Sequence, residues 1–316
     1  MNRTLGIGCL LLTLFVASGA TCRQHTFGVD PTTPAAFVTA PTLDDIIYAV
    51  NANTNRVQQL HTDSAKLSVA GVPTSLRTSV SLEREQRFRL KAKLFGPELD
   101  IGSNDHEFWF WAKHAPEPVV FYASHREFAA SPTRNMFPVD PHWLIDAIGL
   151  VRLEPGGSHE GPIPRGDGNI EVRTRLMRPA GDITRVLVID SRYGWILEQH
   201  LLDATGRAVA SARTSGHRYY TSAAVSLPHR IEIEMPDAEL SLTIDVNEFA
   251  INSLYGSPDQ LWERPQFEGY TPVNIAEPQF MPPSNPMTSS GPVSRPASPP
   301  SRLTQQPAYR GYSTAR

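Results

Sequence analysis

The chain has 316 residues, of which 40% are hydrophobic and 19% are charged, and its formal net charge is -3. The hydrophobic share is too high for a chain that is disordered throughout, and the length allows one large domain or two small ones. Because 29 basic residues are balanced by 32 acidic ones, composition gives no overall attraction for nucleic acid, and no nucleic-acid partner is expected.

Residues 1–21 have the pattern of an export signal. Arg3 precedes an apolar run at 5–16, which is about as long as a signal-peptide core and too short for a permanent membrane span. The small residues that follow suit ordinary signal cleavage, whereas Cys22 supports a second interpretation as the lipid-modified residue of a bacterial lipoprotein. Both interpretations predict an exported protein with 1–21 as its signal peptide.

Cysteine content favours lipidation. The chain has two cysteines, and Cys9 lies within the predicted signal, so the mature chain holds Cys22 alone and forms no internal disulfide. A free thiol is a liability in an oxidising compartment, although an incidental cysteine in a soluble periplasmic chain stays the alternative. Lipidation at Cys22 predicts a periplasmic protein anchored to the outer membrane, with the membrane surface as a partner.

Proline content marks the ends of the folded part. Residues 22–41 carry three prolines and no sustained period, which is typical of a flexible tether. Residues 271–316 hold ten of the 28 prolines with few aliphatic residues, which predicts a disordered tail. The folded domain is therefore predicted at 42–270.

The first element expected in this domain is an amphipathic helix. Thr42 and Asp45 have the spacing of a capping box, and an apolar stripe with helical spacing continues to Leu60. From Thr62 onward apolar and polar residues alternate, as they do in strands with one buried face.

This alternation is clearest at 87–94 and returns at 170–246 after two interruptions. The first interruption is a helix signal at 140–148, where Asp140 is the expected cap, and the second is a Gly/Pro loop at 154–169. The chain therefore predicts an α+β protein, mainly antiparallel β, with about 11–12 strands and two helices.

An antiparallel sheet with one apolar face must close into a barrel, pack on a second sheet or be covered by helices. Two helices cover a curved sheet only in part, and incompletely filled space between helices and sheet is an apolar cavity. The residues alone leave these alternatives open.

The order of helix, strands, helix and strands resembles the LolA/LolB-like carriers and outer-membrane receptors of the bacterial lipoprotein-localisation pathway. The resemblance is strongest at 43–69 and 227–252, and it extends over 42–252. It implies a half-open, unclosed β-barrel covered on its concave face by two helices, with acyl chains of lipoproteins or lipids as the ligands.

Acyl chains suit such a cavity because each buried methylene contributes about 0.8 kcal/mol. The expected lining residues are taken from the apolar face of successive strands, and a filled core is the alternative for each of them. They are Leu67, Val69, Val80, Leu82, Phe88, Leu90, Leu94, Phe108 and Phe110.

Two further groups of side chains are candidates for surface contacts. Trp109 and Trp111 alternate with the two phenylalanines at 108 and 110, so they lie on the opposite face and form a candidate docking surface, with cover by a loop as the alternative. Basic residues alternate along 87–93 and are candidates for contact with anionic headgroups, with a solvated strand face as the alternative.

Motifs for catalysis and metal binding are missing from the sequence, which has no G-x-S-x-G, H-E-x-x-H or Walker motif. His159 beside Glu160, and His200 near Asp203, are the nearest approach to a metal site, and two ligands do not make one. No enzyme activity, catalytic residue, metal or cofactor is predicted.

The sequence therefore predicts a cell-envelope protein that holds acyl chains in a hydrophobic cavity, in lipoprotein sorting or outer-membrane insertion. The alternative is a regulatory or scaffolding module of the same fold that binds a protein partner.

Overall fold

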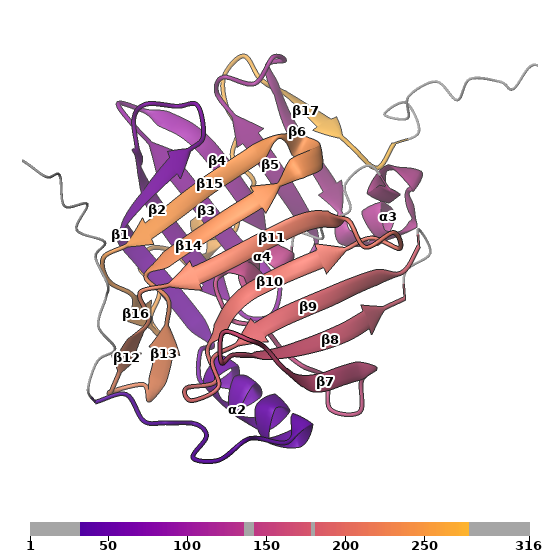
Figure 1. The fold of residues 1–316 in the computed structure, drawn as a ribbon. Helices are drawn as coiled ribbons and strands as arrows, with labels where there is room; N and C mark the ends of the chain where they lie inside the picture. The colour runs from indigo at the N-terminus through magenta and orange to yellow at the C-terminus, as the bar shows by residue number, and fades with distance from the viewer. Residues whose placement is uncertain (1–31, 136–141, 178–180, 278–316) are drawn as a thin grey trace, which may run out of the picture. The chain divides into compact units, whose positions relative to one another are not determined.

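The computed structural model describes residues 32–135, 142–177 and 181–277. Within these ranges a 15-stranded sheet dominates the fold, and a two-stranded hairpin lies outside it (Figure 1). The strands are β1 (Gln59–Val69), β2 (Leu76–Glu83), β3 (Arg87–Lys93), β4 (Pro97–Ser103), β5 (Glu107–Ala112), β6 (Val119–Ser124), β7 (His159–Pro164), β8 (Ile170–Leu176), β9 (Ile183–Ile189), β10 (Ile196–Leu202), β11 (Ala208–Ser215), β12 (Arg218–Tyr220), β13 (Val225–Leu227), β14 (Arg230–Met235), β15 (Leu240–Val246), β16 (Ala250–Ile251) and β17 (Thr271–Asn274).

The sheet is unclosed and mostly antiparallel. Its strands follow the order β17-β6-β5-β4-β3-β2-β1-β15-β14-β11-β10-β9-β8-β7, and β16 pairs with the start of β1. Paired neighbours run antiparallel except β17 and β6, which are parallel. The expected 11–12 strands are too few for the described residues. The prediction of a loop at 154–169 is wrong for β7, which forms there although its Gly and Pro residues hide the strand pattern, and the short strands β12, β13, β16 and β17 span too few residues to show an alternation.

The helix predicted at the start of the domain is confirmed as α2 (Leu43–Asn55). Its capping box forms as expected: Thr42 Oγ1 accepts from Asp45 N at 3.2 Å, and Asp45 Oδ2 accepts from Thr42 N at 2.9 Å. The buried face of α2, which includes Ile46 and Val50, packs against apolar residues of β8, β9 and β10.

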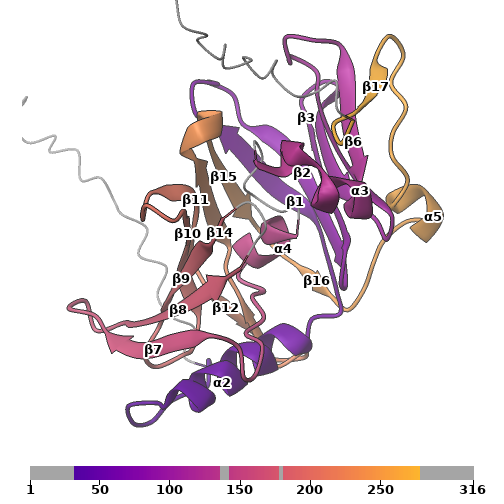
Figure 2. The same ribbon diagram turned by 90° about the vertical axis from the view of Figure 1, so that its right-hand side faces the viewer.

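A shorter helix, α4 (Trp143–Ala147), forms where the second helix was expected. The predicted cap Asp140 lies outside the described residues. Figure 2 shows α4 inside the curve of the sheet, and its residues Trp143 and Ile145 belong to one buried cluster with residues of β1, β2, β3, β10, β11, β14 and β15. The concave face is therefore filled around α4.

Two other helices, α3 (His125–Ala130) and α5 (Pro258–Leu261), were not expected from the sequence. They are accompanied by short 3-10 turns at Pro132–Asn135 and Pro236–Ala238. Helix α3 begins at Ser124, whose side chain accepts from Glu127 N. None of the helices in the described part of the chain is long and apolar enough to span a membrane.

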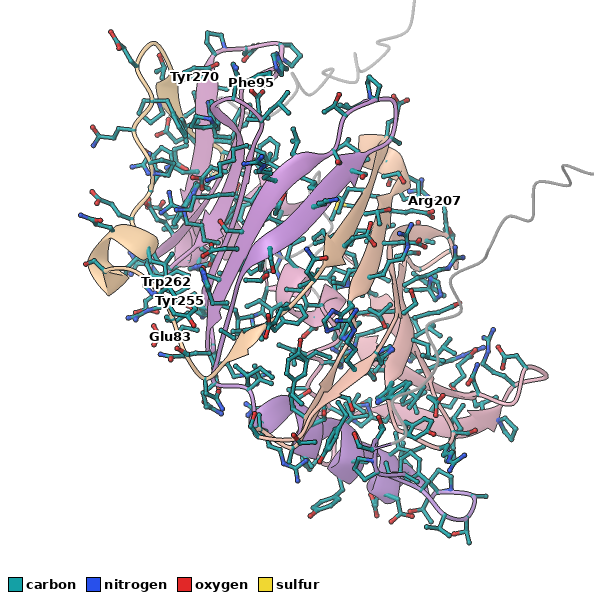
Figure 3. The ribbon with its side chains drawn as sticks, turned by 90° about the vertical axis from the view of Figure 1, so that its left-hand side faces the viewer. Glu83, Phe95, Arg207, Tyr255, Trp262 and Tyr270 are labelled. Atoms are coloured by element: carbon teal, nitrogen blue, oxygen red, sulfur yellow. The ribbon has the colours of Figure 1, made fainter. Side chains whose placement is uncertain are left out.

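The segment after β16 covers the outer face of β3, β4 and β5, and this corrects the prediction of a tryptophan docking surface. Trp109 and Trp111 are 1% and 3% exposed. Trp111 stacks on Phe267 with ring centroids 3.7 Å apart, and Figure 3 shows Trp262 and Tyr270 on the same covering segment. The two tryptophans are not an exposed pair, because residues far ahead in the chain return to bury them.

A buried ion pair lies beside these tryptophans. Arg89 Nη2 is 2.9 Å from Asp100 Oδ2, and Trp109 Nε1 donates to Asp100 Oδ1 at 2.9 Å. Arg89 Nη1 also donates to the carbonyl oxygens of Gln260 and Leu261, which fixes the covering segment. Arg89 is 6% exposed, so neither headgroup contact nor a solvated strand face, the two interpretations of the basic residues along 87–93, holds for it.

Both predicted domain boundaries lie inside the folded part. Phe37, expected in the tether, is buried among the residues that pack against α2, and its N–H donates to Arg192 O at 3.0 Å. At the other end, β17 pairs with β6 and Ile275 is buried, so the ordered domain continues past residue 270. Composition hides these contacts because single apolar residues among prolines carry no periodic signal.

Two buried histidines lie near the β12–β13 hairpin. His217 stacks on Trp195 with centroids 4.4 Å apart, and His229 contacts the Tyr220 hydroxyl through Nε2 at 2.9 Å. Burial, and secondarily the nearby His229, lower the pKa of His217 from 6.5 to about 3. Burial also lowers the pKa of His229.

These shifts predict a fold that loses stability in mild acid. His217 is neutral in the folded chain, whereas the unfolded chain takes up a proton on this side chain below pH 6.5. The contribution of His217 to the free energy of unfolding is therefore fully present above pH 6.5 and decreases as the pH falls toward 3. The loss from His217 at pH 5 is about 2 kcal/mol. Thermal unfolding followed from pH 8 to pH 5 measures it. The His217→Phe variant is expected to show a weaker dependence of stability on pH. The control His106→Phe, at an exposed position, is expected to show the same dependence as the wild type. Equal slopes in the wild type and both variants would contradict the assignment.

A second prediction concerns the outer face. Gly102 in β4 lies directly across from Trp109, and a Cβ atom at this position would overlap the indole ring. Gly102→Ala is therefore expected to displace Trp109 and to lower the free energy of unfolding by about 1–3 kcal/mol. Gly96→Ala is the matched control, since a Cβ there meets nothing within 4 Å. Denaturant unfolding compares the two, and an equal stability of both variants would refute the close packing.

Candidate functional site

The nine residues expected to line a cavity share one face of the sheet, but most of them lie in the filled core. Five are 0–5% exposed and belong to the cluster around α4: Leu67, Val80, Leu82, Phe88 and Leu90. Val69 and Phe108 are half-buried, while Leu94 and Phe110 are 43% and 40% exposed.

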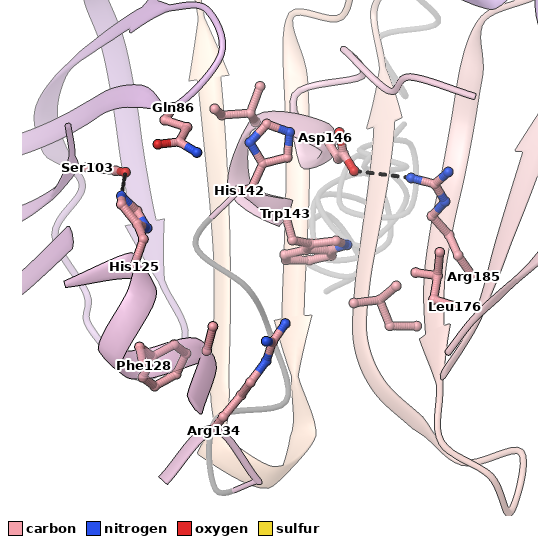
Figure 4. Close-up of a pocket in the computed structure, with 13 residues that line it drawn as sticks. Gln86, Ser103, His125, Phe128, Arg134, His142, Trp143, Asp146, Leu176 and Arg185 are labelled. Carbon is pink, nitrogen blue, oxygen red and sulfur yellow. Dashed lines mark hydrogen bonds and ion pairs between the residues drawn. The ribbon is translucent and has the colours of Figure 1, made fainter. Parts of the chain in front are cut away.

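A pocket of about 370 Å³ does open on this face, but further along it, and none of the nine residues lines it. Figure 4 shows it between α3 on one side and β8 and β9 on the other, with α4 between them. Its lining residues are Gln86, Ser103, His125, Phe128, Ala129, Arg134, His142, Trp143, Ile145, Asp146, Leu176, Arg185 and Leu201.

The lining has an apolar part and a polar part. Phe128, Trp143, Ile145, Leu176 and Leu201 supply the apolar surface, and they come from α3, α4, β8 and β10. The polar part includes a contact of 3.3 Å between the Ser103 hydroxyl and Nε2 of His125. The pocket volume falls at the lower end of the range for small-molecule sites.

An ion pair connects α4 to the sheet at the pocket. Arg185 Nη1 lies 3.3 Å from Asp146 Oδ2, and both side chains are nearly buried. Arg185 Nη2 donates to the carbonyl oxygen of Arg152 at 3.2 Å. Because β9 places Arg185 opposite Leu201 of β10, this guanidinium is held on the concave face.

A second guanidinium lies close to this pair. Burial lowers the pKa of Arg84, and the charge of Arg152 lowers it further, while Asp146 and Glu85 raise it. Arg152 in turn forms an ion pair of 3.2 Å with Glu85. Positive charge is therefore concentrated where α4 meets the β2–β3 turn.

Some buried polar atoms at this face have no hydrogen-bond partner within the part of the chain that the structure describes. They include Nε1 of Trp143 and Nε of Arg185, both on residues that line the pocket. The amide of Gln199, two residues before Leu201 on the same face of β10, is likewise without a partner among the described residues. Unpaired buried polar groups are rare in folded proteins, and others occur elsewhere in the described chain, for example in Trp111 and Trp262; those of Trp143 and Arg185 differ in belonging to pocket-lining residues.

A second hollow, of about 460 Å³, lies between residues 34–41, helix α2 and the β12–β13 hairpin. Tyr48, Tyr193 and Tyr219 are among its lining residues.

The two pairs noted as the nearest approach to a metal site do not gain a third ligand. His159 contacts Thr174 and the carbonyl oxygen of Glu154, and His200 contacts Ser211 and Glu198. Over residues 32–135, 142–177 and 181–277, no three His, Cys, Asp or Glu side chains are grouped to hold a metal ion.

Sequence reasoning placed a helix at 140–148, which contains Trp143, but missed Arg185 and the whole of α3. A signal for Arg185 existed, since this charged residue stands directly before the apolar run 186–189 of β9. Helix α3 has only six residues, too few to show a helical period, although Ser124 and Glu127 have N-terminal spacing.

The sequence matches no protein-family model and no curated protein significantly. Among solved structures, it is similar to an outer membrane lipoprotein-sorting protein domain from Vibrio parahaemolyticus, at 7% identity and a TM-score of 0.45 over 68% of this chain and 95% of that one. A LolA superfamily protein from Nitrosomonas europaea matches at 12% identity and a TM-score of 0.41, over 71% and 99% of the two chains.

The Pseudomonas aeruginosa MucA/MucB complex matches at 14% identity and a TM-score of 0.26, over 70% of this chain and 61% of that one.

The nine expected lining residues differ in burial, and truncation of single side chains tests which of them belong to the hydrophobic core. Leu90→Ala is expected to lower the free energy of unfolding by about 2–5 kcal/mol, because Leu90 is 5% exposed and packs in the cluster around α4. Leu94→Ala on the same strand face is expected to cost much less, since Leu94 is 43% exposed. Chemical denaturation measures both, and a larger loss at Leu94 would reverse this assignment.

Proposed function

We propose that this protein is a cell-envelope binding protein that holds an acyl chain of a lipid or lipoprotein in the pocket between α3, α4 and β8–β10. The observation that carries the proposal is the composition of the pocket wall. Five apolar side chains, contributed by four different elements, face a pocket that also contains a guanidinium group at Arg185. An amphiphile matches this wall, because it combines an apolar acyl chain with a polar headgroup.

Energetics support an acyl ligand. Each methylene removed from water contributes about 0.8 kcal/mol, so a chain of ten buried methylenes gains roughly 8 kcal/mol before the costs of binding. Half-buried apolar residues continue from the pocket along the concave face, among them Leu144, Ile101 and Leu99. They offer further apolar surface to a chain longer than the pocket.

Export and anchoring belong to the same proposal. The signal pattern at 1–21 would send the chain across the inner membrane, and acylation at Cys22 would attach it to the outer membrane. Such an anchor would hold the pocket near the membrane from which lipids or lipoproteins are taken, or to which they are delivered.

The test uses the full chain purified without detergent. Organic solvent extracts the lipids that are bound non-covalently, and mass spectrometry identifies them. Acyl groups bonded covalently to Cys22 stay with the protein in this extraction. We expect about one acyl chain per molecule. Ala129→Trp, at an exposed position of α3 that lines the pocket, is expected to reduce this amount several-fold by occupying the space.

Ala130→Trp is the matched control, because Ala130 is also exposed on α3 and is not part of the pocket lining. It is expected to retain the wild-type amount of lipid. A wild-type protein without extractable lipid, or equal retention in both variants, would exclude the acyl pocket. Recovery of a bound peptide in place of lipid would instead support the regulatory or scaffolding alternative.

A further inference from the structure

We propose that the pocket selects an acidic single-chain amphiphile, a fatty-acid carboxylate, through the indole Nε1 of Trp143 and the Nε of Arg185. This inference rests on the proposed function, since it names the headgroup of the acyl ligand. The two nitrogens are donors on residues that line one pocket, and neither has a hydrogen-bond partner in the described chain.

Both residues are deeply buried, so their free donors are costly without a ligand. Trp143 is 3% exposed and Arg185 is 9% exposed. Figure 4 shows the indole nitrogen on the edge of the Trp143 ring that faces Arg185. Two donors on the same side of a pocket suit the two oxygen atoms of a carboxylate, which is the strongest acceptor for a guanidinium.

Asp146 does not use up the donor capacity of Arg185. A guanidinium has five N–H groups, and here Nη1 contacts Asp146 while Nη2 donates to the carbonyl of Arg152. Nε is the one nitrogen of this guanidinium that has no partner among the described residues. The ligand carboxylate would therefore bind along a different edge of the guanidinium from Asp146.

The charge around the pocket also favours an anion. Arg84, Arg152 and Arg185 lie around Asp146, and Glu85 is the other acidic group in this set. Among these described residues three guanidinium groups face two carboxylates; Arg185 and Asp146 are nearly buried, whereas Arg152 and Glu85 are partly exposed to solvent. A ligand carboxylate beside Arg185 would therefore meet a nearby excess of positive charge.

The apolar part of the pocket wall would contact the acyl chain of the ligand. Phe128 lies across the pocket from Arg185 in Figure 4, with Trp143 between them. A chain that starts at the two donors would pass over Trp143 toward Phe128. A volume of about 370 Å³ suits one chain and a small headgroup, because drug-sized and larger ligands need pockets of up to about 1,000 Å³.

The test compares decanoate with 1-decanol, which has the same chain length and no charge, by isothermal titration calorimetry on the full chain at pH 8. We expect decanoate to bind about tenfold more tightly. Trp143→Phe keeps the ring and removes the N–H, so it is expected to weaken decanoate about five- to tenfold and 1-decanol less than twofold.

Trp262→Phe is the matched control, because its Nε1 is also buried and unpaired within the described residues but Trp262 is not part of this pocket. It is expected to bind both ligands as the wild type does. Without ligand, Trp143→Phe is expected to unfold at the same or a higher temperature, since the N–H it loses is unpaired. Arg185→Lys, which keeps the charge and loses Nε–H, is a second variant and is expected to lose decanoate affinity similarly.

Equal wild-type affinities for decanoate and 1-decanol would overturn the carboxylate site and leave the proposed function standing. An unchanged decanoate affinity in both Trp143→Phe and Arg185→Lys would overturn it as well. Absence of binding by both ligands would overturn the acyl pocket together with its headgroup site. Inorganic phosphate, which has charge and no chain, is expected to bind far more weakly than decanoate, and tighter binding of phosphate would overturn the assignment to an acyl ligand.

Discussion

The apolar concave face of an unclosed sheet has to be removed from water, and the segment at 142–153 does most of this. Trp143 and Ile145 join residues from both halves of the sheet in one buried cluster. Helix α2 holds the same segment in place, since Asn51 both donates to Leu153 O and accepts from Leu153 N. The core and the pocket thus depend on one short stretch of chain, which fills part of the concavity and borders the part left open.

The sequence predicts the sheet better than it predicts the site. Alternation at 87–94 and the capping box at Thr42 are local signals, and they are confirmed because burial on one face is what gives strands and helices their periods. Pocket residues carry no such signal. Leu90 and Leu201 look alike in sequence, yet only Leu201 lines the pocket, because the packing of α4 decides which part of the face is filled.

The burial of the outer face of β3, β4 and β5 could not be predicted from the sequence for a related reason. Trp109 and Trp111 have the alternation of exposed residues on a one-sided sheet, but residues about 150 positions later return to cover them. Arg89 likewise made strand β3 look solvated on one face, because a buried arginine paired with Asp100 and a solvated arginine are identical in a sequence pattern. Long-range cover of this kind can be found only in the folded chain.

The parallel pairing of β17 with β6 has a consequence for how such a protein survives at high concentration. A free border strand offers unpaired amide and carbonyl groups to neighbouring molecules and invites polymerisation. At one border the last strand is β17, which has only four residues and contains Pro272, so it offers few such groups to a neighbour. At the other, β7 contains Pro162 and Pro164, which lack the N–H that an incoming strand would need. The sheet therefore stays unclosed, although neither border strand readily pairs with a second copy of the chain.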